Sequence, residues 1–131
     1  MNYYIASSWA NMKQVQVLTE NLQALGHSVF AYGRDDRNFV PKTELSLEEN
    51  FSEDQRQALF DQDLEGLRGA QIFILLLPAG NSSHIQAGIA YALGKETILI
   101  GEEQKAEIQY SIFTHNFPTI ERFLEGKRKE A

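Results

Sequence analysis

A polar turn between two apolar segments carries the residues best suited to chemistry in this chain. The turn lies within residues 78–94, and its polar members are Gly80, Asn81, Ser82 and Ser83. We expect a helix over 84–93, with Ser82 or Ser83 as its N-cap and Gly94 as its C-cap glycine. Helix-start N–H groups point outward unpaired and carry partial positive charge, so the turn can hold an anion or a sugar. The two serines can equally be plain helix caps.

Short apolar segments on either side must position this turn. Residues 72–77 read Ile-Phe-Ile-Leu-Leu-Leu and stop at Pro78, and residues 97–100 read Thr-Ile-Leu-Ile. Such short runs, rich in β-branched side chains and ended by a proline, predict buried parallel strands. Residues 3–6 and 28–32 predict two further strands.

Helical patterns alternate with these strands. Over residues 11–25, apolar side chains recur at steps of three and four before Gly26: these are Val15, Leu18, Leu22 and Leu25. Residues 52–55 read as a capping box ahead of a second helix that ends near Gly69. Its apolar face consists of Leu59, Phe60, Leu64 and Leu67. A last helix is expected over 120–125, with Pro118 in its first turn and a frayed charged tail behind it.

Two stretches have no clear period. Residues 33–51 form either a functional lid or a partly helical segment, because nineteen structureless residues are long for a compact domain. Residues 102–109 are expected to be a loop or a short helix.

Together the patterns predict one α/β domain over residues 1–131, flavodoxin-like or Rossmann-like. Its parallel sheet has the order 2-1-3-4, with a possible fifth strand, and helices flank it. Ligands bind such sheets at the carboxyl ends of the strands, where the strand order reverses. That rule places Ser7, Ser8 and Trp9 beside residues 80–86. Trp9 either packs in the core or stacks on a base.

Bulk properties exclude several classes of protein. The chain has 131 residues, 43% of them hydrophobic, which suits one packed domain. A net charge of −6 argues against a nucleic-acid polymer or an anionic membrane as partner. The sequence has neither an apolar run long enough for a membrane span nor a signal-peptide pattern, and it contains no cysteine. We therefore expect a cytoplasmic protein. His84 has no second histidine near it, so we expect no metal and no cofactor.

With these residues in view, the chain resembles the nucleoside 2-deoxyribosyltransferase family over residues 3–101. The resemblance rests on Tyr4-Ile-Ala, on Asp63 ahead of Gly69-Ala-Gln-Ile, and above all on residues 78–97. The last of these matches a short branch with the pattern Pro-x-Gly-x-Ser-x-His-hydrophobic-Glu-x-Gly. The resemblance implies cleavage of the N-glycosidic bond of nucleosides or nucleotides, through a glycosyl ester on the motif glutamate. It further implies that Tyr4 and Asp63 orient the substrate.

The same resemblance implies assembly. A homodimer or larger homo-oligomer is expected, in which an asparagine near the C-terminus completes the site of a neighbouring subunit. Asn116 is the candidate for that position in this chain.

Two positions depart from the family pattern. The nucleophilic glutamate falls on Gln86, whose neutral amide has no anionic oxygen to form an ester. This chain should therefore bind substrate with little turnover, as a substrate-trapping variant or a binding-only relative. Where the best-known members carry an aspartate for the sugar 5′-hydroxyl, this chain has Gly80, followed by Asn81, Ser82 and Ser83. That change suits a nucleoside 5′-monophosphate, since a carboxylate would repel the phosphate.

Two alternatives to an enzyme of this family stay open. One is a non-catalytic nucleotide-binding sensor or sponge in which Gln86 is native. The other is an NAD-cleaving relative, since Toll/interleukin-receptor-type domains use a glutamate on a similar fold. In each case the expected ligand is a small nucleoside or nucleotide.

Overall fold

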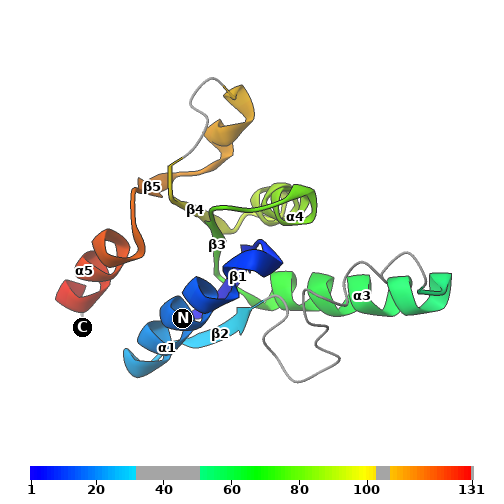
Figure 1. Cartoon of the computed structure of the whole chain (residues 1–131), viewed down its shortest axis with the longest axis horizontal. Helices are drawn as coiled ribbons and strands as arrows, with labels where there is room; N and C mark the ends of the chain where they lie inside the picture. The colour runs from blue at the N-terminus through cyan, green and yellow to red at the C-terminus, as the bar shows by residue number, and fades with distance from the viewer. Residues whose placement is uncertain (32–50, 103–106, 131) are drawn as a thin grey trace.

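The computed structural model describes residues 1–31, 51–102 and 107–130, and its centre is a five-stranded sheet. The strands are β1 (Asn2–Ser7), β2 (Ser28–Ala31), β3 (Ile72–Leu76), β4 (Glu96–Ile100) and β5 (His115–Phe117). All neighbours pair in parallel, in the order β2-β1-β3-β4-β5 (Figure 1). The predicted order 2-1-3-4 is confirmed, and the possible fifth strand is present.

Helices cover both faces of the sheet, as the alternation of side chains along each strand requires. On one face, Tyr3 and Ile5 of β1 pack with α1 (Met12–Ala24) and α5 (Ile120–Glu130). On the other, Tyr4 and Ala6 pack with α3 (Glu53–Gly69) and α4 (Asn81–Ala92). Figure 1 shows the two helix pairs on opposite sides of the strands. Full burial of an aliphatic side chain contributes about 1.5–3 kcal/mol, so these two layers carry the fold.

The helix signals were mostly read correctly. In α1, Val15, Leu18 and Leu22 are buried as predicted. Gly26 (φ 94°) and Gly94 (φ 79°) follow α1 and α4 in the left-handed conformation that stops a helix, which confirms both predicted stops.

The capping box at Ser52 is also present, since Ser52 Oγ accepts from Gln55 N and Gln55 Oε1 accepts from Ser52 N. The packing of α3 is looser than its apolar pattern predicts. Only Leu67 is buried, and the side chain of Phe60 is 48% exposed. Figure 1 shows the first half of α3 extending beyond the strands.

Three boundaries were predicted wrongly. The helix expected over 84–93 begins at Asn81, with Gly80 as N-cap and no side-chain cap, so neither Ser82 nor Ser83 caps it. Residues 115–117 form β5, and Pro118 precedes the last helix instead of lying in its first turn. The tail is helical to Glu130, because Phe123 and Leu124 are buried against the sheet and hold α5 in place.

The two stretches without a clear period are only partly described. Residues 33–50 and Tyr32, the end predicted for the second strand, lie outside the described residues, as do residues 103–106. Within the stretch predicted as loop or short helix, the described part ends in a short 3-10 helix, η3 (Ile108–Ile112). No helix in the described part of the chain is both long and apolar enough to cross a lipid bilayer.

Candidate active site

Hydrogen bonds join the carboxyl ends of β1 and β3, at the place where the strand order reverses. The hydroxyl of Ser7 lies 2.7 Å from the carbonyl oxygen of Leu76, to which it donates. Ser8 N donates to the carbonyl of Pro78 at 3.0 Å, and Ser83 Oγ donates to the carbonyl of Ser7 at 3.1 Å. The turn after β1 and the start of α4 are therefore side by side, as the strand order predicts.

Asn11 is a member of this network that the sequence reading missed. Its side-chain amide donates to Ser7 Oγ at 3.0 Å and to the carbonyl of Leu77 at 3.3 Å. The signal available in the sequence was an asparagine four residues after Ser7, which one turn of helix brings back toward it. Trp9 opens the short 3-10 helix η1 (Trp9–Asn11) between them and is half-buried.

The two serines of the turn have different surroundings. Ser82, like Asn81, is exposed in the first turn of α4. Ser83 is buried, and its hydroxyl proton is directed to the Ser7 carbonyl, so it fastens α4 to β1. The N-cap residue is Gly80, so no side-chain cap closes the start of α4 and neither serine has the predicted cap role.

Gln86 and Asp63 meet across the two helices of one face. Gln86, on α4, is 8% exposed, and its Nε2 donates to Asp63 Oδ2, on α3, at 3.3 Å. The helix contains no Asp, Glu, Lys or Arg, so no such charged side chain of α4 itself acts on this pair. The contact places an uncharged amide beside a carboxylate, and the amide stands at the position where the resemblance implies the nucleophilic glutamate.

Tyr4 and Asn116 lie on strands β1 and β5. Tyr4 is fully buried on the face covered by α3 and α4, with its ring stacked between Phe30 (centroids 4.9 Å apart) and Phe73 (5.7 Å). Asn116 is exposed in β5, opposite Leu99, and two strands separate β5 from β1. Within one chain, Asn116 is therefore not part of the Gln86–Asp63 neighbourhood.

His84 completes the start of α4. Its Nδ1 is 2.8 Å from the Gly80 carbonyl oxygen, and its Nε2 is 3.0 Å from the hydroxyl of Tyr110 on η3. Among the described residues, no three His, Asp or Glu side chains gather as ligands of a metal would.

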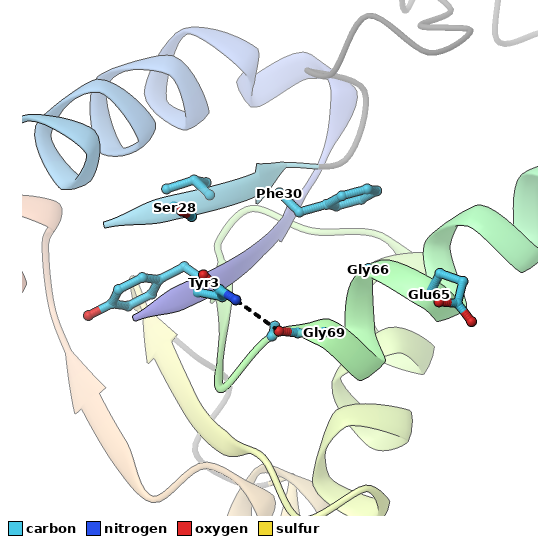
Figure 2. A pocket seen from close by; sticks show the side chains of 9 residues that line it. Tyr3, Ser28, Phe30, Glu65, Gly66 and Gly69 are labelled. Carbon is cyan, nitrogen blue, oxygen red and sulfur yellow. Dashed lines mark hydrogen bonds between the residues drawn. The ribbon is translucent and has the colours of Figure 1, made fainter. Parts of the chain in front are cut away.

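A pocket of about 360 Å³ lies at the opposite end of the sheet, between the starts of β1 and β2 and the last turns of α3 (Figure 2). Asn2 Nδ2 donates to the carbonyl of Gly69 across it. Glu65 is the charged side chain in its lining and pairs with Arg68 at 3.6 Å. Among the described residues of its lining, no group of polar side chains converges there, so the pocket is a poorer candidate site than the end that holds Gln86.

Comparison with known proteins yields likeness of fold. No protein-family model matches the chain, and no curated protein matches it in sequence. Among solved structures, a 2-deoxyribosyltransferase of Bacillus psychrosaccharolyticus superposes with a TM-score of 0.68 at 24% identity, over 92% of this chain and 88% of that one. A CMP N-glycosidase of Clostridium botulinum superposes with a TM-score of 0.65 at 15% identity, over 98% of this chain and 99% of that one. A conserved protein of Enterococcus faecalis superposes with a TM-score of 0.66 at 15% identity, over 100% of this chain and 99% of that one.

Proposed function

We propose that this chain acts at the N-glycosidic bond of nucleosides or nucleoside 5′-monophosphates. The observation that carries the proposal is the hydrogen bond between buried Gln86 and half-buried Asp63, on adjacent helices of a fold shared with a deoxyribosyltransferase and a CMP N-glycosidase. The ligand would occupy the end of the sheet where the strand order reverses, which is where α/β sheets bind small molecules.

The reaction of that class needs an anionic oxygen at position 86. A carboxylate oxygen attacks the anomeric carbon, the bond from that carbon to the base nitrogen breaks, and the base leaves after gaining a proton. Water or a second base then displaces the carboxylate from the sugar. Gln86 offers only a neutral amide oxygen, so we propose that this chain binds its ligand with little turnover. Asp63 and Tyr4 would orient the ligand.

A 5′-phosphate would lie at the start of α4. Asn81 and Ser82 are exposed there, and no carboxylate lies in the first turn of the helix to repel an anion. The N–H groups at a helix start favour negative charge. Because the hydroxyl proton of Ser83 is directed to Ser7, the side-chain donors for the phosphate would be Asn81 and Ser82.

A second candidate function is nucleotide binding without catalysis. The hydrogen bond from Gln86 to Asp63 favours it, since an amide beside a carboxylate is satisfied without any reaction. Both candidates use the same ligand and differ only in turnover.

We also propose that the partner protein is a second copy of this chain. The outer face of α4 exposes apolar side chains, with Ile85 63% and Tyr91 54% exposed, and the helix has no charged residue. Exposed apolar patches are typical of interaction sites. Copies that each carry a charge of −6 repel one another least where they meet through an uncharged surface.

The test compares the unchanged chain with its Gln86→Glu variant, using Gln14→Glu on the exposed side of α1 as the matched control. Each is incubated with deoxynucleosides, their 5′-monophosphates and NAD, and released base is measured by chromatography. We expect Gln86→Glu to release base about 10³-fold faster than the unchanged chain and Gln14→Glu do, which is equivalent to a barrier lower by about 4 kcal/mol. Mass spectrometry should detect a glycosyl adduct on that variant during turnover.

Calorimetry with the unchanged chain supplies the other half of the test. Monophosphates should bind at least about tenfold more tightly than nucleosides, as charge-assisted hydrogen bonds predict. Binding of ligand without base release by any variant would favour the binding protein. Failure of every nucleoside, nucleotide and NAD to bind would overturn both candidates.

A further inference from the structure

His84 joins two segments that are far apart in the sequence, at the edge of the candidate site. Its Nδ1 lies 2.8 Å from the carbonyl oxygen of Gly80, and its Nε2 lies 3.0 Å from the hydroxyl oxygen of Tyr110. A carbonyl oxygen only accepts, so Nδ1 must carry a proton. In the neutral imidazole Nε2 is then an acceptor, and the Tyr110 hydroxyl donates to it. The pair of contacts therefore selects one tautomer of His84.

The contact with Gly80 orients one peptide plane. The Gly80 carbonyl accepts both the backbone N–H of His84, at 3.2 Å, and its Nδ1–H. In a planar trans peptide, the N–H of the next residue points opposite to the carbonyl. With the Gly80 carbonyl directed along the helix, the N–H of Asn81 points out of the helix start. That is the direction from which an anion would approach.

Tyr110 is itself held in place. Its ring lies nearly parallel to that of His84, with centroids 5.8 Å apart and planes at 13°. It meets the buried ring of Phe113 edge-on at 5.8 Å. Next to it, Thr97 Oγ1 of β4 donates to the carbonyl of Ile112 at 2.5 Å. Through Tyr110, His84 is connected to the sheet and is not merely a surface side chain of α4.

We propose that His84 is a positioning residue for the phosphate of the ligand. Held in its Nδ1–H tautomer by Tyr110, it fixes the Gly80–Asn81 peptide with the N–H directed at the 5′-phosphate. This role rests on the proposed function, because it concerns the phosphate end of the same ligand. It follows that disturbing His84 weakens binding of monophosphates and leaves binding of nucleosides unchanged.

Two substitutions separate the two hydrogen bonds. The side-chain nitrogen of His84→Asn reaches the place of Nδ1 and keeps the bond to Gly80, whereas the amide end of His84→Gln reaches the place of Nε2 and keeps only the contact with Tyr110. Calorimetry is run with the four deoxynucleoside 5′-monophosphates and the four deoxynucleosides. We expect His84→Gln to weaken monophosphate binding about tenfold, and His84→Asn to stay within about threefold of the unchanged chain. Nucleoside binding should change less than twofold in both.

Tyr110→Phe and nitrogen NMR test the tautomer without any ligand. Spectra of ¹⁵N-histidine-labelled protein distinguish a protonated ring nitrogen from a bare one. The unchanged chain should have the proton of neutral His84 on Nδ1, and Tyr110→Phe should show a mixture of tautomers. A proton on Nε2 in the unchanged chain would overturn the inference, whatever the binding data give.

The two proposals fail in different ways. If the unchanged chain prefers monophosphates and His84→Gln keeps that preference in full, the positioning role is wrong and the proposed function stands. If the unchanged chain binds neither class of ligand, the proposed function is wrong, and the role of His84 in phosphate binding is wrong with it.

Discussion

Replacing Gln86 with glutamate should destabilise the folded chain as well as change its chemistry. Gln86 Nε2 donates to Asp63 Oδ2 at 3.3 Å, and the substitution removes that donor and places a second carboxylate against the first. A hydrogen bond to a charged group contributes about 1.5–3 kcal/mol. Two like charges about 3.3 Å apart repel by about 1 kcal/mol in water and about 5 kcal/mol at an effective dielectric of 20. Because Asp63 is only half-buried, the lower part of that range applies, and a loss of about 2–4 kcal/mol is expected at neutral pH.

The loss should depend on pH with a definite sign. Repulsion within a carboxylate pair raises a pKa of the pair in the folded chain above its value in the unfolded chain. A group with a raised folded pKa is stabilising below its unfolded pKa, and that contribution is lost as the pH rises through the folded pKa. The stability of Gln86→Glu relative to the unchanged chain should therefore increase as the pH is lowered from 7.5 to 4.5.

Urea unfolding followed by the fluorescence of Trp9, the single tryptophan, measures these differences. The double variant Gln86→Glu/Asp63→Asn restores an amide–carboxylate pair with its polarity reversed, and should recover stability to within about 1 kcal/mol of the unchanged chain. Gln14→Glu should change stability by less than about 0.5 kcal/mol. If Gln86→Glu were as stable as the unchanged chain at pH 7.5, the contact between positions 63 and 86 would not be the one described.

Three further outcomes are expected. Ile85→Glu should convert the oligomer to a monomer in light scattering. Val17→Glu should not, because Val17, which is 43% exposed, lies in the helix layer on the other face of the sheet. A monomeric unchanged chain at tens of micromolar would contradict the proposal that the partner is a second copy of this chain. Ser52→Ala should speed amide hydrogen exchange over residues 53–60 about fivefold, because a lost N-cap costs about 1 kcal/mol, and Ser52→Asp should keep the slow rate. Burial raises the pKa of Tyr3, although the nearby charge of Lys127 lowers it. The neutral Tyr3 side chain therefore stabilises the folded chain below pH 10, and above pH 10 this contribution falls by up to about 1.4 kcal/mol per pH unit. Tyr3→Phe should remove that component from the difference in unfolding free energy between pH 7 and pH 11, and an unchanged difference would contradict it.

The outline of the fold could be predicted from local patterns. The alternation of short apolar strands with amphipathic helices, such as the stripe of Val15, Leu18 and Leu22, predicted a parallel sheet and its strand order. The sequence predicted a fifth strand as a possibility but did not locate it, because residues 115–117 are few and largely polar and become extended by pairing with the free edge of β4. The polar tail is helical because Phe123 and Leu124 are buried, and local helix propensity does not predict that burial.

The candidate site divides in the same way. Its location at the end of β1 and β3 followed from the chain order, since parallel strands put their carboxyl ends at one edge. Its contacts did not follow. The sequence left Ser83 as a helix cap or a ligand-binding residue, whereas its hydroxyl donates to the carbonyl of Ser7, 76 positions away in the sequence. His84 contacts Tyr110, 26 positions away. Hydrogen bonds between residues a few positions apart are reflected in local sequence patterns. Hydrogen bonds between elements far apart in the sequence depend on distances that are determined only when the helices and the sheet pack together. By itself, the sequence determined most of the elements, their order and the end of the sheet where a site is expected. The tertiary structure decided that Gln86 faces Asp63, because only packing of α3 against α4 brings positions 63 and 86 together.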